Sequence, residues 1–516
     1  MKGQRVAIMT RVRALGRRGV TSDVALLAGS LALYLGTLAP TVYTFDSAEL
    51  AAGAYALGIV HATGYPLYLL LAKAFMLMVP WGDMAYRANL FSALCAALSL
   101  VLLRRVMVAL TGSPGAALAA AAALGASFPF WSQAVVAEVY TLHMLLVAGM
   151  LWFLLAWRAS GRPRHLIGLA LVFGLSLGNH MSAVLLAPGL ALFLWRERGH
   201  HPIPPAVLGL ACGAAALGPL TYLYLPLRYA AGPALNYAET LGVDLRTADG
   251  VAWMVRGAMF SHVMFGYRVA ELPAEVFRFG ALVWRTFLGA GPALAALGLV
   301  TQWGRDRTAA AALGLMGGGT AVFYVSYRVP DKDTMFLVPL LVVSVWMAVG
   351  FERVLAWAGR TGARRPRRVA ALAAAGVVAA LVVTNYPRVD LRGNDNVRRH
   401  AEAVLGEVAA DAFIVGGWVH ITPLAYLQVV EGRRPDIQLF DWGLYGLGRQ
   451  ARLRAQGLPA DEARHAALDE ILVTVQRELL SGRPVYSLED NHLLRERFVL
   501  LRQRHVVRVC EPDGCQ

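Results

Sequence analysis

Long apolar runs repeat along the first three quarters of this chain and constrain its fold more than any other feature. Most of these runs have about 17–25 residues, the length that an α-helix needs to cross the hydrocarbon core of a bilayer. Of the 516 residues, 57% are hydrophobic and only 16% are charged, a composition that soluble proteins of this size rarely have. We therefore expect a polytopic α-helical membrane protein.

The basic residues lie mainly in short segments between the apolar runs. The formal net charge of +15 could indicate a nucleic-acid partner. Clustering in short loops is instead typical of cytoplasmic loops that face anionic lipid head groups. We therefore expect no nucleic-acid partner, a location in the plasma membrane in contact with its lipids, and a cytoplasmic N-terminus.

The apolar runs predict about 11 spans, all within a membrane domain at residues 1–386. The run at 166–195 is too long for one helix and is interrupted by Gly-Asn-His-Met-Ser at 178–182, which predicts two short helices. The expected spans are 24–40, 88–110, 115–131, 141–157, two within 166–195, 204–226, 276–301, 308–326, 335–356 and 369–386.

Two segments near the N-terminus need separate interpretation. The apolar run at 66–80 is short and contains Lys73, so we expect it to lie along the interface within an outer loop at 41–87. The run at 24–40 could instead belong to a signal peptide. Its length, and the lack of a small-residue cleavage site before Tyr43, favour a membrane span.

From residue 387 onward the chain loses its membrane character. Short apolar runs at 412–415 and 437–440 predict buried strands around a helix near 422–431. Residues 461–480 have helical periodicity, and 485–487 and 498–500 predict further strands. An odd number of spans after a cytoplasmic N-terminus places this small α/β domain, residues 387–516, outside the cytoplasm.

The four cysteines fit the same topology. Cys510 and Cys515 enclose a turn-forming loop, and a disulfide between them requires an oxidising compartment. Cys95 and Cys212 lie inside apolar runs and are most simply small core residues.

Two carboxylates, Asp46 and Glu49, follow the first apolar run and lie on one face if their segment is helical. A carboxylate at a membrane boundary is usually paired, hydrated or functional, because dehydrating it is costly. The alternative interpretation is structural: Asp46 caps a short interfacial helix that has Glu49 in its first turn.

The expected topology gathers other polar residues on the same outer side. Carboxylates there could act as general bases, whereas Arg and Lys could hold a lipid-linked phosphate. Aromatic residues such as Tyr65, Trp131, Tyr140 and Trp253 could stack on a sugar, or simply anchor the chain at the interface. The histidines could be satisfied polar residues, and residues 331–333 a solvated turn. The polar residues are Asp46, Glu49, His61, Arg87, Asn89, Glu138, His143, His180, Arg228, Arg328, Asp331, Lys332 and Asp333.

Three short motifs resemble the DUF2723 family of membrane glycosyltransferases, which includes protein O-mannosyltransferases. They are Asp-Ser-Ala-Glu-Leu at 46–50, His-Ala-Thr-Gly-Tyr-Pro-Leu at 61–67 and Tyr-Arg-Ala-Asn-Leu at 86–90. Gly-Asn-His at 178–180 and the segment 418–436 fit the same pattern. The chain departs from the family at Ala48, where Gly is usual, and at 62–63, where the family has Pro-Pro.

The resemblance implies a GT-C fold and transfer of a sugar from a polyprenyl phosphate carrier to an acceptor hydroxyl on the outer face. We expect an inverting transfer of a hexose, first of all mannose, to a protein, lipid or glycan. The family's catalytic base matches Asp46, with Glu49 as its alternative or helper. No cofactor is required, and Asp331 and Asp333 leave a divalent metal open. Residues expected to bind the donor are His61, Tyr65, Arg87, His143, His180, Arg328 and Lys332; acceptor or supporting residues are Glu138, Tyr140, Asn179 and Trp253.

Two other classes of protein compete with this interpretation. A transporter or lipid flippase would suit the interrupted run at 166–195. Against that class, the charged residues cluster toward the outer face, and the sequence has no detectable inverted repeat. An inactive scaffold, whose α/β domain binds a partner, is the third class.

Overall fold

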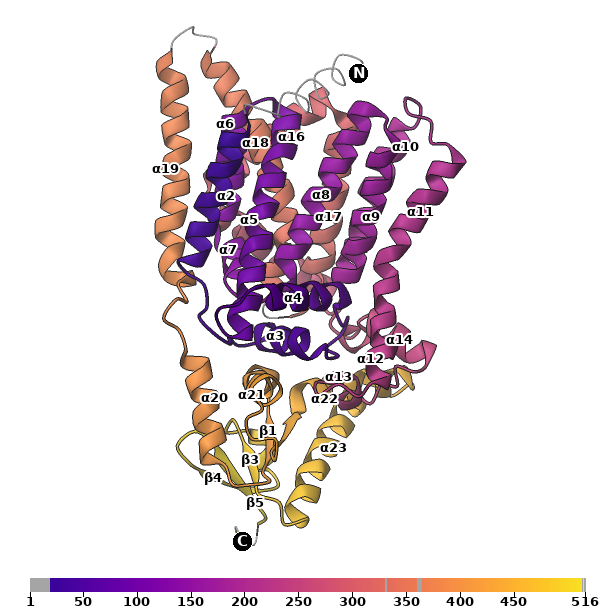
Figure 1. Cartoon of the computed structure of the whole chain (residues 1–516), viewed down its shortest axis with the longest axis vertical. Helices are drawn as coiled ribbons and strands as arrows, with labels where there is room; N and C mark the ends of the chain where they lie inside the picture. The colour runs from indigo at the N-terminus through magenta and orange to yellow at the C-terminus, as the bar shows by residue number, and fades with distance from the viewer. Residues whose placement is uncertain (1–18, 330–331, 360–363, 513, 515–516) are drawn as a thin grey trace. The chain divides into compact units, whose positions relative to one another are not determined.

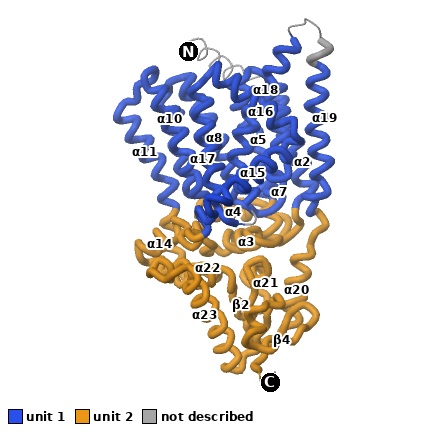
Figure 2. Tube along the Cα trace, turned by 180° about the vertical axis from the view of Figure 1, so that it is seen from behind, with its two compact units in different colours: residues 1–38, 90–221, 263–391 blue, residues 39–89, 222–262, 392–516 orange. Residues whose placement is uncertain are grey.

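The structure is a computed structural model that describes residues 19–329, 332–359, 364–512 and 514, and it is mainly helical (Figure 1). The chain forms two compact units, each assembled from three separate stretches (Figure 2). Unit 1 comprises residues 1–38, 90–221 and 263–391, and unit 2 comprises residues 39–89, 222–262 and 392–516. The unit that contains the C-terminal region thus also includes two stretches from the expected membrane domain.

Unit 1 is a bundle of helices, many of which run side by side (Figure 1). Its elements are α2 (Val20–Leu35), α5 (Met84–Thr111, which begins in unit 2), α6 (Pro114–Gly125), α7 (Phe128–Ala134), α8 (Val139–Ser160), α9 (Pro163–Asn179), η1 (Met181–Leu186), α10 (Ala187–Glu197), α11 (Pro205–Leu220), η4 (Val269–Glu271), α15 (Leu272–Thr286), α16 (Ala290–Arg305), α17 (Arg307–Val325), η5 (Lys332–Phe336), α18 (Leu337–Gly359) and α19 (Arg364–Val389).

The helices of unit 1 include segments that can cross a membrane. Among the described residues, six helices are long and apolar enough, or eight if each of two bent helix pairs is one span. The chain is therefore a multi-pass membrane protein, and the count of 11 stays a prediction. The polar interruption expected at 178–182 is observed: α9 ends at Asn179, and a 3₁₀ turn begins at Met181.

Glycines let the helices of unit 1 approach closely. Gly174 of α9 faces Gly218 of α11, and a Cβ on either residue would overlap the backbone of the other helix. Such small-residue contacts are typical of membrane helices, where packing rather than hydrophobic burial holds helices together. Cys212 of the same helix is exposed, so its expected place in the core is wrong. The helix is long and apolar, but only a minor part of its surface is buried.

Unit 2 combines short helices with an α/β region. Its elements before residue 392 are α3 (Asp46–Ala56), α4 (Pro66–Met78), α12 (Tyr224–Ala230), α13 (Tyr237–Thr240), α14 (Ala248–Val255) and η3 (Ala258–Phe260), with η2 (Thr221–Leu223) at its border. The later elements are α20 (Asn396–Glu407), β1 (Phe413–Gly416), α21 (Trp418–Glu431), β2 (Gln438–Asp441), α22 (Trp442–Ala455), α23 (Ala460–Leu480), β3 (Val485–Ser487), α24 (His492–Arg495), β4 (Val499–Arg502) and β5 (Val507–Cys510).

The strands form one mixed sheet in the order β2-β1-β3-β5-β4. The first three strands are parallel, and Gly416 at the end of β1 pairs with Asp441 at the end of β2. Helices α20 and α21 cover one face, and α22 and α23 cover the other (Figure 1). On the second face, Phe413 and Val415 of β1 pack against Leu472 and Val475 of α23. The four strands expected from sequence are present, whereas β5 and α22 were not expected.

The C-terminal cysteines are only partly covered by the structure. Cys510 at the end of β5 is disulfide-bonded. Cys515, its expected partner, lies outside the described residues.

Candidate active site

The carboxylate pair of the first motif lies at the start of α3, as its spacing predicts. Phe45 precedes the helix with a φ of 58°, a sharp turn that places Asp46 and Glu49 in the first helical turn. Residues Ser47 to Ala54 are all buried, and α3 packs against α4 and α21 within unit 2. Close packing requires Gly53, because a Cβ there would collide with the side chain of Val60.

Glu49 is a buried carboxylate that accepts three hydrogen bonds. Its Oε1 accepts from the backbone N–H of His61 at 2.6 Å, and its Oε2 lies 2.9 Å from His61 Nδ1. The indole Nε1 of Trp418 donates to the same Oε2 at 2.9 Å. Its side chain has 0% exposure. Glu49 therefore holds His61 and Trp418 in place.

His61 is the centre of the cluster. Its Nε2 lies 3.1 Å from the hydroxyl of Tyr65 and 3.9 Å from Asp46 Oδ2. Burial lowers the pKa of His61. The charge of Glu49 and its hydrogen bond to the ring outweigh this effect of burial, and the charges of Asp46 and Asp441 add smaller contributions. The pKa of His61 is therefore raised to about 9. At neutral pH the ring is therefore an imidazolium.

Asp46 differs from Glu49 in accessibility. Its side chain keeps 23% exposure, whereas that of Glu49 keeps none. The more accessible carboxylate thus lies beside a cation whose orientation the buried carboxylate sets. This arrangement can accept a proton at Asp46 while His61 balances the negative charge.

Aromatic rings surround His61. Its ring centroid lies 4.9 Å from that of Trp418, 5.2 Å from that of Tyr65 and 6.3 Å from that of Phe260. Sequence reasoning did not assign Trp418 or Phe260 to the site. Trp418 lies in the segment 418–436, which resembles the family, and this resemblance could have indicated its place in the site.

Asp441 and Tyr237 also belong to this cluster and were missed. Burial and the charges of Glu49 and Glu489 raise the pKa of Asp441, whereas hydrogen bonds from two backbone N–H groups lower it. The net result is a pKa of about 7. Burial raises the pKa of Tyr237 well above its ordinary value, and the negative charges of Glu49, Asp441 and Asp46 raise it further. Because these residues come from distant segments, no local motif could reveal them.

Two other expected residues of unit 2 have different surroundings. The guanidinium of Arg87 donates to the backbone carbonyls of Met76, Trp81 and Gly82 at 3.0–3.3 Å. We therefore assign it to holding the loop after α4 rather than to a donor phosphate. Trp253 lies half-buried on α14.

Five expected residues gather in unit 1, where the start of α8 meets the end of α9. Glu138 caps α8 by accepting from the N–H of Val139, and Asn179 donates to the carbonyl of Val139 at 3.1 Å. The rings of Tyr140 and His143 each lie 5.6 Å from that of His180. These contacts tie α8 to α9.

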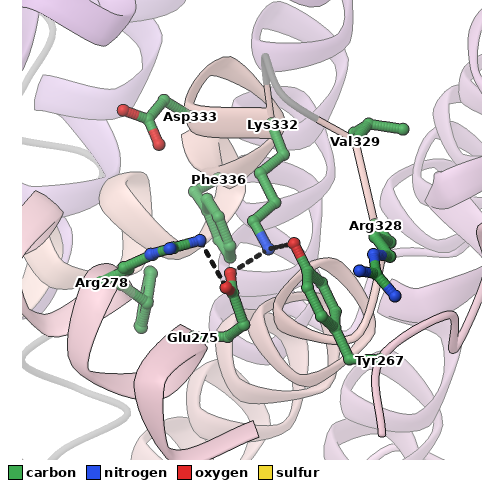
Figure 3. Close-up of a pocket in the computed structure, with 9 residues that line it drawn as sticks. Tyr267, Glu275, Arg278, Arg328, Val329, Lys332, Asp333 and Phe336 are labelled. Carbon is green, nitrogen blue, oxygen red and sulfur yellow. Dashed lines mark hydrogen bonds and ion pairs between the residues drawn. The ribbon is translucent and has the colours of Figure 1, made fainter. Parts of the chain in front are cut away.

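Unit 1 also contains a cavity of about 300 Å³ lined by charged side chains (Figure 3). The Nζ of Lys332 donates to Glu275 Oε2 at 2.6 Å and to the Tyr267 hydroxyl at 3.3 Å. Arg278 also donates to Glu275, whereas Arg328 keeps 55% exposure and lies 3.8 Å from Glu271. Arg278 and Glu275 were not expected, although their spacing on α15 places both on one helical face.

The part of the chain that the structure describes contains no cluster of side chains that could bind a metal ion. No group of three or more His, Cys, Asp or Glu side chains is placed there to hold an ion. Asp331, one of the two residues named for this role, lies outside the described residues.

Residues 46–202 match the family model of the N-terminal domain of protein O-mannosyl-transferase TMEM260. The mouse (Mus musculus) protein O-mannosyl-transferase TMEM260 is 26% identical over 446 residues, which cover 81% of this chain and 62% of the mouse protein. The chain is thus similar in sequence to TMEM260 over most of its length. It spans less than two thirds of the length of that curated relative.

Solved structures share the fold of this chain. ArnT from Cupriavidus metallidurans bound to undecaprenyl phosphate superposes with a TM-score of 0.62 at 15% identity, over 94% of this chain and 97% of ArnT. The apo state of the same protein gives a TM-score of 0.57 at 14% identity, over 96% and 99% of the two chains. The similarity confirms the expected GT-C-like fold.

The region of this chain that matches the family model begins at Asp46 and includes His61, His143 and His180. Trp418 and Asp441 lie beyond its end at residue 202, so the family domain alone does not contain the whole cluster.

Proposed function

We propose that this protein is a glycosyltransferase that moves a hexose, first of all mannose, from a polyprenyl phosphate carrier to an acceptor hydroxyl. The observation that carries the proposal is the pairing of an accessible Asp46 with the His61 imidazolium, itself held by the buried Glu49. The relative named as an O-mannosyl-transferase and the fold shared with ArnT support the same class of reaction.

In this proposal Asp46 is the general base. It takes the proton of the acceptor hydroxyl while that oxygen attacks the anomeric carbon, and the bond from this carbon to the phosphate oxygen breaks. Polyprenyl phosphate leaves with the electron pair, and the sugar inverts at the anomeric carbon. A positioned base of this kind typically contributes about 10²–10⁴-fold to the rate.

Unit 1, considered by itself, contains a cavity whose cationic groups suit a lipid phosphate. Lys332 is buried against Glu275, whereas Arg328 and Arg278 keep 55% and 71% of their side chains exposed. A guanidinium matches two phosphate oxygens at once. We therefore propose that Arg328 and Arg278 bind a lipid phosphate at this cavity, with Lys332 as its buried support.

The predicted orientation remains part of the proposal. The site faces the outside of the plasma membrane, the N-terminus is cytoplasmic and the C-terminal region is extracytoplasmic. The acceptor is a protein, lipid or glycan hydroxyl.

A transfer assay tests the proposal. Purified protein in lipid nanodiscs is incubated with radiolabelled polyprenyl phosphate sugars and a membrane extract as acceptor pool. Wild type and the control Asp469→Asn, an exposed carboxylate of α23, are expected to move label from the carrier, and Asp46→Asn is not. Normal transfer by Asp46→Asn would overturn its role as base. No transfer from any carrier by folded wild-type protein would overturn the activity, and lipid movement between leaflets would then favour a flippase.

A further inference from the structure

The strand order of unit 2 reverses at β1, because the connection from β1 leads to β2 on one side and the connection from β2 returns to β3 on the other side. Strand β1 leads into α21, whereas its neighbour β2 leads into α22, whose Trp442 packs on the face of the sheet that α23 covers. In open α/β sheets, ligands bind in the crevice outside the carboxyl ends of strands at such a reversal. Residues that directly follow β1 and β2 are therefore placed to meet a ligand.

The residues at this edge include two anchored indole rings. Trp418 opens α21, and its Nε1 donates to Glu49 Oε2 at 2.9 Å. Trp442 opens α22, and its Nε1 donates to Glu489 Oε1, just beyond β3, at 2.8 Å. Both rings are half-buried, so each keeps part of its apolar surface accessible.

Asp441 at the end of β2 carries an unsatisfied oxygen. Its Oδ1 accepts from the N–H of Leu444 at 3.0 Å and so caps α22. Asp441 is only 3% exposed. Its Oδ2 is buried, yet it has no hydrogen-bond partner among the described residues. A buried polar atom without a partner costs about 1–3 kcal/mol, so a natural structure rarely keeps one without a ligand or water to satisfy it.

The unsatisfied oxygen belongs to the surroundings of Asp46. The charge of Asp441 acts on both His61 and Tyr237, and the charge of Glu49 acts on Asp441. In addition, a Cβ added to Gly443, two residues after Asp441, would lie 3.8 Å from the backbone N of Trp418. The edge of the sheet and the Asp46–Glu49–His61 cluster thus form one continuous site within unit 2.

We propose that this edge is the sugar subsite of the Asp46 site, in which Asp441 Oδ2 binds a hydroxyl of a hexose and Trp418 lines one side of its ring. Sugar hydroxyls donate to carboxylates, and the C–H surface of a sugar packs on aromatic rings. The inference rests on the proposed function and deepens it, because it gives the C-terminal region a direct part in substrate recognition. The hexose belongs either to the donor or to a glycan acceptor, which share this chemistry.

The contribution of the sugar to binding can be distinguished from that of the phosphate by measuring the affinity of the purified full chain for two lipids. The probes are polyprenyl phosphate mannose and bare polyprenyl phosphate. Asp441→Asn keeps a good N-cap residue and replaces the unsatisfied oxygen with an amide. Its affinity for the mannose lipid is expected to fall by about 10-fold or more, with no change for the bare lipid. The matched control Asp469→Asn is expected to bind both lipids like wild type.

Two further measurements complete the test. Asp441→Ser keeps a capping hydroxyl but lacks Oδ2, and its loss of mannose-lipid affinity should match that of Asp441→Asn if both variants keep the wild-type unfolding temperature. A rise confined to the KM of a glycan acceptor would support the subsite and assign the hexose to the acceptor. Unchanged donor affinity together with an unchanged acceptor KM in both variants would overturn the subsite. Failure of folded wild-type protein to bind either the mannose lipid or bare polyprenyl phosphate would instead overturn the proposed function.

Discussion

Trp418 and Glu49 are 369 residues apart in the sequence and are joined by a 2.9 Å hydrogen bond from the indole N–H to the carboxylate. The bond attaches the first residue of α21 to the first turn of α3. Because the same carboxylate also holds His61, α21 contributes to the orientation of the ring beside Asp46. Glu49 is thus a positioning residue in our proposal, and Asp46 is the catalytic one.

Replacing Glu49 with Gln should shift the pH dependence of transfer. In wild type, His61 stays protonated up to its pKa of about 9, so we expect the rate to fall as pH rises through that value. Without the Glu49 charge the pKa of His61 falls, and the decline should begin at lower pH. Rates of Glu49→Gln and Asp469→Asn over pH 6–10 test this, and superimposable profiles would exclude the positioning role.

Protonation of His61 should also stabilise the fold. Its pKa is about 9 in the folded protein and 6.5 for the free side chain, so the stabilisation is complete below pH 6.5 and is lost as pH rises through about 9. We expect wild type to lose on the order of 1–3 kcal/mol of unfolding free energy over that window. The pKa of Asp441 is also raised, to about 7, so this residue likewise makes the unfolding free energy fall as pH rises, but below pH 7. The effect of His61 on stability is therefore best measured above pH 7.

The variant His61→Gln isolates this effect. It cannot titrate, so the difference in unfolding temperature between wild type and His61→Gln should shrink as pH rises through about 9. A constant difference across the window would contradict the raised pKa.

Arg87→Ala should reduce stability rather than donor binding. The guanidinium donates to three carbonyls at the end of α4 and in the loop after it. Losing these bonds is expected to cost about 1–3 kcal/mol. Thermal unfolding should show this cost, while the affinity of the folded variant for polyprenyl phosphate stays within about 2-fold of wild type. A large loss of lipid affinity at unchanged stability would restore Arg87 as a phosphate ligand.

Arg328 and Lys332 should respond differently to removal of their charge. Arg328 is more than half exposed, so Arg328→Ala is expected to weaken binding of polyprenyl phosphate and leave the unfolding temperature nearly unchanged. Lys332 is buried against Glu275, and Lys332→Met should destabilise by about 1–3 kcal/mol because the buried carboxylate loses one of its two cationic partners and keeps only Arg278. Lipid binding and thermal unfolding, measured on both variants, check these outcomes. If Arg328→Ala binds the lipid with the same affinity as wild type, Arg328 is not part of the proposed phosphate site.

The orientation can be checked with one accessible residue. Asp469 is exposed on α23, in the region expected outside the cytoplasm. In intact cells, Asp469→Cys should therefore react with a membrane-impermeant maleimide before lysis. Labelling that appears only after lysis would reverse the predicted topology.

Local patterns explain the parts that could be predicted. The helix break after Asn179, the short helix at 66–78 and the strands β1 to β4 follow from hydropathy and polar interruptions within a few residues. Cys212 was misplaced because an apolar run does not distinguish a side chain in the core from one on the outer surface of a membrane bundle.

The sequence by itself determined that the chain crosses a membrane and that Asp46 and Glu49 share the first turn of a helix, because hydropathy and helical periodicity are local properties. Only the tertiary structure decided which of the two carboxylates is buried, which holds His61, and that Trp418 and Asp441 join them. Burial and pKa depend on every neighbouring atom, and here those neighbours come from segments hundreds of residues apart. No local pattern of residues encodes such a neighbourhood.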